Sequence, residues 1–263
     1  MSGRWLPGWP EEFSGRLPIA SDVSAALGID PLAVLLRSTA AMALTTLRGR
    51  ESTVTAGSLR VRGVLEELTV GPDRRGELGR LGEVRLAARE VTPPGVPRLR
   101  RVVLSARDAR LRPALPVVEL VATPVLVEVE IDPADLPMRR RMRLAVDPAG
   151  IATLHLGRID RVRLEVVLRR TARTVTVGAR ALRVFALRIP LPGRVLRRRI
   201  AIDRLPQGVR LTGVRTGVGV VRVSAVLDRW STPITASALG DVAAALAAGA
   251  TELVLPCGRA SER

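Results

Sequence analysis

The spacing of apolar residues divides the chain into helical and extended segments. Residues 32–47 carry apolar side chains at helical spacing, namely Leu32, Leu35, Leu36, Met42, Ala43 and Leu47. Asp30 is suited to cap such a helix, Pro31 to open it and Gly49 to end it. The pattern predicts an amphipathic helix packed on a sheet, with a helix on a membrane surface as the alternative.

After residue 50 the apolar period becomes two, which is typical of strands with one polar face. Alternation runs from Val54 to Val70, where Leu59 and Val61 lie between Arg60 and Arg62. Further strands are predicted at 117–121, 125–131, 142–146, 151–156, 162–168, 174–177, 182–189, 209–211 and 218–227, with turns at 147–150 and 191–193. Antiparallel hairpins with one apolar face are the expected product.

A weak internal repeat supports the hairpins. Residues 81–88, 99–106 and 159–166 share an apolar residue three positions before an alternating V-x-L-x-A/V segment. Residues 92–95, Thr-Pro-Pro-Gly, form the turn between the first two copies. Chance produces such a pattern easily in a chain rich in Leu, Val and Arg, so it indicates strands rather than a repeat family.

Two short segments complete the predicted elements. Asp132 is placed to cap a helical turn over 133–136, and the Ala-rich residues 236–248, stopped by Gly249, predict a helix that covers a sheet edge. We therefore expect a strand-dominated α+β protein with a helix at each end. We expect a Pro/Gly-rich arm at 1–29, a helix plus antiparallel β domain at 30–230, and a C-terminal helix and tail at 231–263.

Charge adds a candidate partner class. All 42 basic residues are Arg against 25 acidic ones, giving a net charge of +17, and Lys, Asn and Tyr are absent. A GC-rich genome explains these absences, yet the acidic residues do not balance the arginines. The resulting field favours nucleic acid phosphates, anionic headgroups or acidic proteins. Nucleic acid ranks low, because only five aromatic residues are available for base stacking: Trp5, Trp9, Trp230, Phe13 and Phe185.

Catalytic motifs are missing from the sequence. Cys257 and His155 are the only residues of their types, G-x-S-x-G does not occur, and without Lys there is no phosphate-loop lysine. We therefore predict that the protein is not an enzyme and that it has neither a cofactor nor a metal site. No stretch reaches the roughly 20 apolar residues of a spanning helix, and no apolar segment follows the basic residue near the start. These features predict a cytoplasmic protein, peripheral at the inner face of the membrane.

Arginine clusters are the candidate anion ligands. Guanidinium groups bind phosphate through paired hydrogen bonds, and their stems tolerate apolar surroundings. The densest clusters are Arg139, Arg140, Arg141 and Arg143, and Arg197, Arg198 and Arg199. Solvated loop ends are the simplest alternative for each cluster.

Several segments, taken in order, resemble the actinobacterial LmeA family of phospholipid-binding proteins. Residues 79–91 are similar to its G-x-L-x-x-V-x-L-x-A-x-x-V strand and are followed by Pro93-Pro94-Gly95 and a second strand from Leu99 to Ala106. Residues 131–136 are similar to its short helix after a V-x-V-x-I strand. Residues 202–215 resemble its closing LP-x-G turn and last strand. The resemblance covers roughly residues 50–230.

The resemblance implies a curved sheet wrapped against a helix, a cradle like the tubular lipid-binding folds. Acyl chains would lie on apolar strand faces, with Leu35, Val84, Leu86, Val102, Leu104, Val162 and Leu164 as candidates, while the two Arg clusters hold phosphate. Family members usually enter the envelope through an N-terminal signal or anchor, and this chain shows neither. The expected function is non-catalytic binding of phospholipid or of an anionic membrane surface. The alternative is an intracellular scaffold that binds an acidic protein partner.

Overall fold

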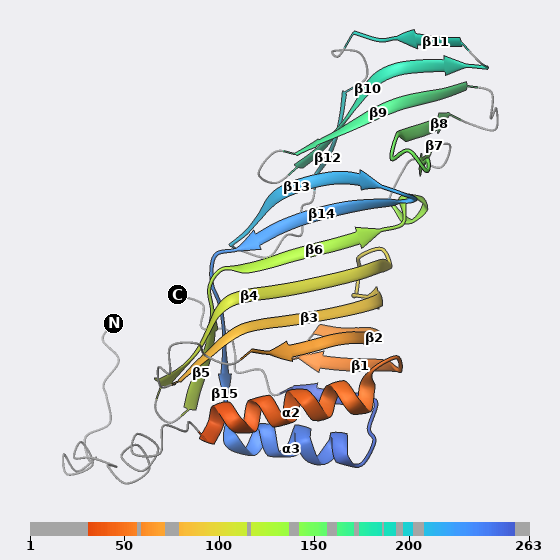
Figure 1. Ribbon diagram of the computed structural model, residues 1–263. Helices are drawn as coiled ribbons and strands as arrows, with labels where there is room; N and C mark the ends of the chain where they lie inside the picture. Colours follow the sequence, from red (N-terminus) through yellow and green to blue (C-terminus); the bar gives the residue numbers. More distant parts are fainter. Residues whose placement is uncertain are drawn as a thin grey trace, which may run out of the picture.

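The computed structural model describes residues 31–56, 59–71, 79–114, 117–136, 142–156, 162–170, 174–185, 187–192, 197–201 and 208–255. The predicted arm at 1–29, Arg139 to Arg141 and Cys257 lie outside these ranges. Within them the chain is a strand-dominated α+β protein with two curved sheets and two α-helices, as Figure 1 shows. The expected fold class is thus confirmed.

The larger sheet, sheet A, carries ten strands. Eight of them run in the order β13-β14-β6-β4-β3-β2-β1-β16, and β5 and β15 branch from β4. The bounds are β1 Glu51–Ala56, β2 Leu59–Val70, β3 Arg80–Thr92, β4 Leu99–Ala114, β5 Val117–Ala122, β6 Val125–Ile131, β13 Val209–Gly217, β14 Val220–Leu227, β15 Trp230–Ile234 and β16 Glu252–Leu255. All pairs in it are antiparallel except β1 with β16.

Three neighbouring stretches of sheet A bend at the same place: β4, β5 with β6, and β14 with β15. Residues 99–106 of β4 pair with β6, whereas residues 109–114 of the same strand pair with β5. The corner between β5 and β6 contains the cis Thr123–Pro124 bond. The chain bends in the same way between β14, which pairs with β6, and β15, which pairs with β5. The bent ends β5 and β15 descend toward the helices (Figure 1), so the sheet curves around them.

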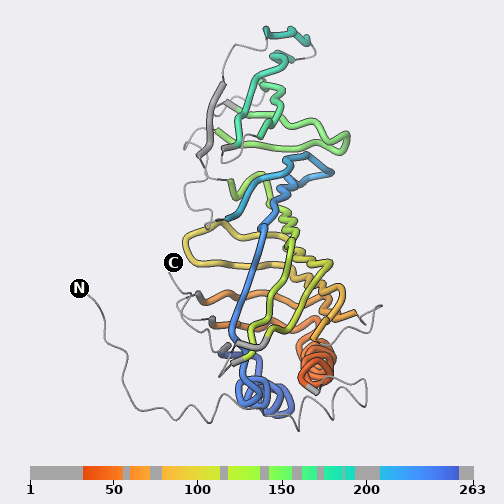
Figure 2. The backbone as a smooth tube through the Cα atoms, turned by 90° about the vertical axis from the view of Figure 1, so that its left-hand side faces the viewer, coloured from red at the N-terminus to blue at the C-terminus, as the bar shows by residue number. Residues whose placement is uncertain are grey.

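The smaller sheet, sheet B, lies at the end of sheet A remote from the helices (Figures 1 and 2). Among the described residues, hydrogen bonds join the two sheets: Arg170 Nη1 donates to the Leu211 carbonyl at 2.9 Å, and Thr216 Oγ1 donates to the Gly150 carbonyl at 2.6 Å. The strand order in sheet B is β11-β10-β9-β8-β7, with β12 beside β10. The bounds are β7 Met142–Val146, β8 Ala152–Leu156, β9 Val162–Arg170, β10 Thr174–Val184, β11 Leu187–Pro190 and β12 Arg197–Ala201.

Helices α2 (Pro31–Leu47) and α3 (Ala236–Ala247) lie side by side at the opposite end (Figures 1 and 2). Thr235 caps α3 by accepting from the Ala238 amide at 3.2 Å. Ala43 and Leu47 of α2, Leu246 of α3 and Leu253 of β16 form one core cluster. In the part of the chain that the structure describes, neither helix has both the length and the apolar character to cross a bilayer.

Most predicted elements are confirmed, and several bounds differ. The cap of the short 3-10 helix η2 (Pro133–Asp135) is as expected, since Asp132 Oδ1 accepts from the Ala134 amide at 2.9 Å. The single strand expected at 182–189 is instead broken, because Phe185 adopts a φ of 56° and reverses the chain between β10 and β11. Strands β12, β15 and β16 were not predicted.

Candidate functional site

One face of sheet A is aliphatic across six strands. Residues directly opposite each other in neighbouring antiparallel strands point to the same side of a sheet. The register of β2, β3, β4, β6, β14 and β13 therefore gathers one set of side chains, which we call the apolar face. It consists of Leu65, Leu68, Val70, Val84, Leu86, Ala88, Val102, Leu104, Ala106, Val125, Val127, Val129, Ile131, Val221, Val223, Ala225, Leu227, Val209, Leu211 and Val214.

Both ends of the apolar face are covered. At the β2 end, Leu65 and Leu68 pack into the cluster with Leu246, and Val70 and Val84 pack with Ala33 of α2. At the β13 end, sheet B packs on the face, and its core cluster includes Leu144, Leu154, Leu164, Val166 and Val221. The helices therefore cover one end of the apolar face and sheet B covers the other, with the middle of the face between them.

The middle of the face, on β3, β4 and β6, stays partly open. We call it the central apolar face, and it comprises Leu86, Ala88, Val102, Leu104, Val129 and Ile131. All six side chains are partly exposed, and within the described residues none belongs to a core cluster. Aliphatic groups left in contact with water on a sheet are unfavourable, so this area gains free energy from an apolar ligand.

The opposite face of sheet A is polar, and several of its arginines are paired with carboxylates. Arg101 donates to Glu66 at 2.9 Å and Arg85 donates to Glu67 at 3.1 Å, linking β4 and β3 to β2. Across β14 and β6, Arg222 donates to Glu130 at 2.7 Å. Paired in this way across strands, these arginines hold the surface of the sheet rather than a free anion, and they mark this side as the solvated one.

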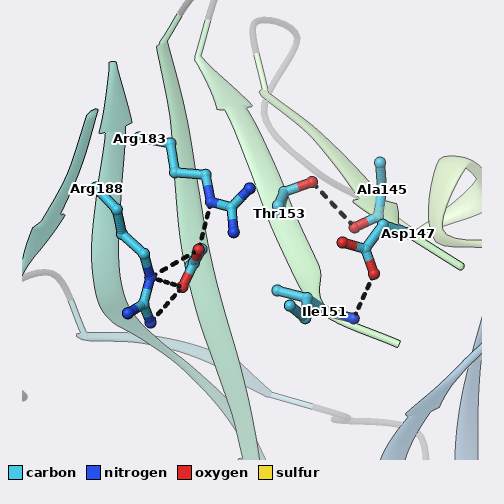
Figure 3. Close-up of polar contacts among 7 residues, drawn as sticks. Ala145, Asp147, Ile151, Thr153, Arg183 and Arg188 are labelled. Carbon is cyan, nitrogen blue, oxygen red and sulfur yellow. Dashed lines mark hydrogen bonds and ion pairs between the residues drawn. The ribbon is translucent and has the colours of Figure 1, made fainter. Parts of the chain in front are cut away.

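Sheet B carries a buried carboxylate between two arginines. Glu165 of β9 is 3% exposed, and Arg183 of β10 donates to it at 2.5 Å. Arg188 of β11 donates through Nε and Nη2, at 2.9 Å for Nη2. Figure 3 shows both guanidinium groups pointing at the same carboxylate. Hydrogen bonds from Arg188 and then Arg183 hold the pKa of Glu165 below its ordinary 4.5, outweighing the opposite effect of burial.

A cleft of about 600 Å³ opens beside this carboxylate, between sheet B and β13. Its wall combines apolar side chains of both sheets with Glu165, Thr216 and four arginines, Arg180, Arg183, Arg188 and Arg215. Four guanidinium groups around one carboxylate give the cleft an excess of positive charge. Such a cleft favours phosphate or carboxylate groups.

We expect Glu165→Gln to lower the free energy of unfolding by about 2 kcal/mol at pH 7, because two arginines then face each other without a counter-charge. Their half exposure keeps the loss below that of a fully buried pair. Since the folded pKa of Glu165 is depressed, its stabilisation is present above pH 4.5 and is lost as the pH falls through the folded pKa. Urea unfolding at several pH values should therefore show the difference from the wild type narrowing below pH 4.5.

The control for that substitution is Glu130→Gln, which removes a carboxylate from the more exposed Arg222 pair. A loss of less than about 1 kcal/mol is expected there. Equal losses at the two positions, or a Glu165 effect that does not vary with pH, would contradict the assignment of the charged pair as the source of stability.

The predicted acyl-chain residues fall into three groups. Val84 and Leu86 of β3 and Val102 and Leu104 of β4 share the apolar face, with Leu86 directly opposite Leu104. Leu164 is 4% exposed in the core of sheet B, where Val162 pairs with Val184. Leu35 is partly buried on α2. The structure therefore brings four of the seven onto one face and leaves Leu86, Val102 and Leu104 on its open part.

The predicted headgroup residues are only partly described. Arg143 is exposed on β7, opposite His155 of β8. Arg197, Arg198 and Arg199 belong to β12, whose backbone pairs with β10. Sequence reasoning missed the arginines of the cleft, because Arg180, Arg183, Arg188 and Arg215 are not consecutive. The only signal was Glu165, a single acid in an otherwise apolar and basic strand.

The resemblance to the LmeA family stays a prediction. No protein-family model, no curated protein and no solved structure matches the chain.

Proposed function

We propose that this protein binds phospholipid without catalysis and holds the acyl chains on the central apolar face. The observation that carries the proposal is that face itself: six aliphatic side chains on three adjacent strands, partly exposed between two buried flanks. A fatty tail needs only apolar area, about 0.8 kcal/mol for each CH₂ group that it buries. Side chains without polar atoms suit such a ligand and discriminate little between tails.

The arginines that line the cleft support binding of a phosphate group at one border of this face. Thr216, which lines the arginine cleft, is opposite Val221, and Val221 is opposite Ile131 of the central apolar face. Two strand spacings, about 10 Å, therefore separate the border of the cleft from the open aliphatic area. This short separation supports a headgroup site at the border of the cleft for a lipid whose tails lie on the central apolar face.

The test compares neighbouring valines of β4 that face opposite sides of the sheet. Val102 points to the central apolar face, whereas Val103 is opposite Ala87 on the polar side, and both are partly buried. We expect Val102→Ser to weaken binding of monomeric dihexanoyl phosphatidylglycerol about tenfold, because two apolar contacts are replaced by a hydroxyl. Val103→Ser should leave binding within twofold of the wild type, as measured by calorimetry.

Lipid extraction of the purified wild type gives the second measurement. Phospholipid recovered by mass spectrometry in the wild type and depleted in Val102→Ser supports the proposal. A wild type that neither carries phospholipid nor binds the short-chain lipid would refute it and would favour the scaffold that binds an acidic protein. Equal effects of the two valine substitutions would place the lipid elsewhere.

A further inference from the structure

The hairpin formed by β10 and β11 exposes three large apolar side chains. Phe185 is 70% exposed, Leu187 is 63% exposed and Ile189 is 40% exposed. The hairpin lies at the end of the molecule farthest from the helices, at the top of Figure 1. Single exposed apolar residues are common, but three within one short hairpin form a patch, and patches mark interaction sites.

Backbone preference does not explain Phe185 in this turn. Its φ of 56° lies in the left-handed region, where a bulky side chain is unfavourable and Gly, Asn or Asp is usual. A side chain that gains burial in the protein could offset this cost, but Phe185 remains largely in solvent. A conformation of this kind is typical of sites where function determines the residue.

Arginines lie behind the apolar tip. Arg183 and Arg188 are directly opposite each other at the base of the hairpin, and Glu165 fixes both guanidinium groups. Arg180 is exposed on β10 in the same wall of the cleft. Three guanidinium groups against one carboxylate leave the hairpin positive. Apolar side chains at a tip with basic residues behind them match the order of layers in an anionic bilayer, with acyl chains inside and phosphates outside.

We propose that the β10–β11 hairpin docks on an anionic phospholipid bilayer, with Phe185 and Leu187 in the acyl boundary and Arg180, Arg183 and Arg188 at the level of the phosphates. This inference rests on the proposed function, because it names the membrane surface from which the bound lipid is taken. Docking itself needs no lipid on the central apolar face, so the two proposals can be tested separately.

The test is cosedimentation with vesicles of equal parts phosphatidylcholine and phosphatidylglycerol. We expect the double substitution Phe185→Ser and Leu187→Ser to weaken vesicle binding at least tenfold, because both apolar insertions are lost. The matched control is Val254→Ser, which removes a side chain that is 68% exposed on β16 at the helical end. It should bind as the wild type does. All these positions are at the surface, so circular dichroism should show folded variants.

The contribution of positive charge to vesicle binding is tested by Arg180→Gln, which keeps the Glu165 contacts of Arg183 and Arg188. About fivefold weaker binding to the anionic vesicles is expected, with no change on vesicles of phosphatidylcholine alone. Wild type that does not sediment with anionic vesicles at low salt overturns the docking proposal. So does a double variant that sediments as strongly as Val254→Ser.

Monomeric dihexanoyl phosphatidylglycerol separates the two proposals. If the double variant binds this soluble lipid normally but not the vesicles, docking is supported and lipid binding stands. If wild type binds the soluble lipid but no vesicle, docking fails alone. If wild type binds vesicles through the hairpin but not the soluble lipid, the proposed function fails while docking stands.

Discussion

Gly79→Ala is expected to lower the free energy of unfolding by about 3 kcal/mol. Gly79 has a φ of 74°, and a Cβ atom added there would lie 2.6 Å from the carbonyl oxygen of Leu111. The left-handed conformation costs an L-residue about 1–2 kcal/mol, and relief of the clash requires movement of the buried β3–β4 backbone, at a further cost of about 1–3 kcal/mol. Urea unfolding followed by circular dichroism measures the loss.

Gly249→Ala provides the control for the clash. Gly249 has the same φ of 74° at the end of α3, but no atom lies within 4 Å of an added Cβ. Only the backbone cost of about 1 kcal/mol should remain. Similar losses at the two glycines would show that the contact with Leu111 contributes nothing.

Leu246→Ala is expected to cost about 3 kcal/mol. Leu246 of α3 is 1% exposed and joins α2, β2 and β16 in one cluster, so its truncation leaves a cavity at the point where both helices meet the sheet edge. Denaturant unfolding at constant m-value measures the loss, and hydrogen exchange should show faster opening of β16 than of β3.

The control is the same Leu→Ala substitution at an exposed position. Leu187→Ala on β11 removes a side chain that is 63% exposed and should change stability by less than about 0.5 kcal/mol. A Leu246→Ala variant that is as stable as Leu187→Ala would mean that the helical end contributes little to the fold.

Local periodicity carried most of the fold prediction. The helix over 32–47 and the strands over 142–146 and 125–131 were predicted nearly to the residue, because their apolar residues recur at helical or strand spacing. The division into two sheets could not be predicted, since period two shows that a strand has an apolar face but not which sheet it joins. Strand β16 has only four residues and pairs with distant β1, so it carried no local signal.

The candidate site was predictable where it rests on alternation. The repeat at 81–88 and 99–106 placed Leu86 and Leu104 in adjacent strands, and they are direct cross-strand partners. Burial of Leu164 was not predictable, because it depends on how sheet B packs. The contact of Glu165 with Arg183 and Arg188 joins three strands, so sequence clusters of arginine did not reveal it.

The parallel pairing of β1 with β16 has a consequence for biosynthesis. Thr53 is opposite Glu252, so the ribosome adds roughly 200 residues after β1 before its partner exists, which takes about 10–40 s at typical elongation rates. During that interval the outer edge of β1 has an unpaired row of amides and carbonyls that can recruit another nascent chain. A chaperone that shields this edge during translation should therefore raise the yield of native protein.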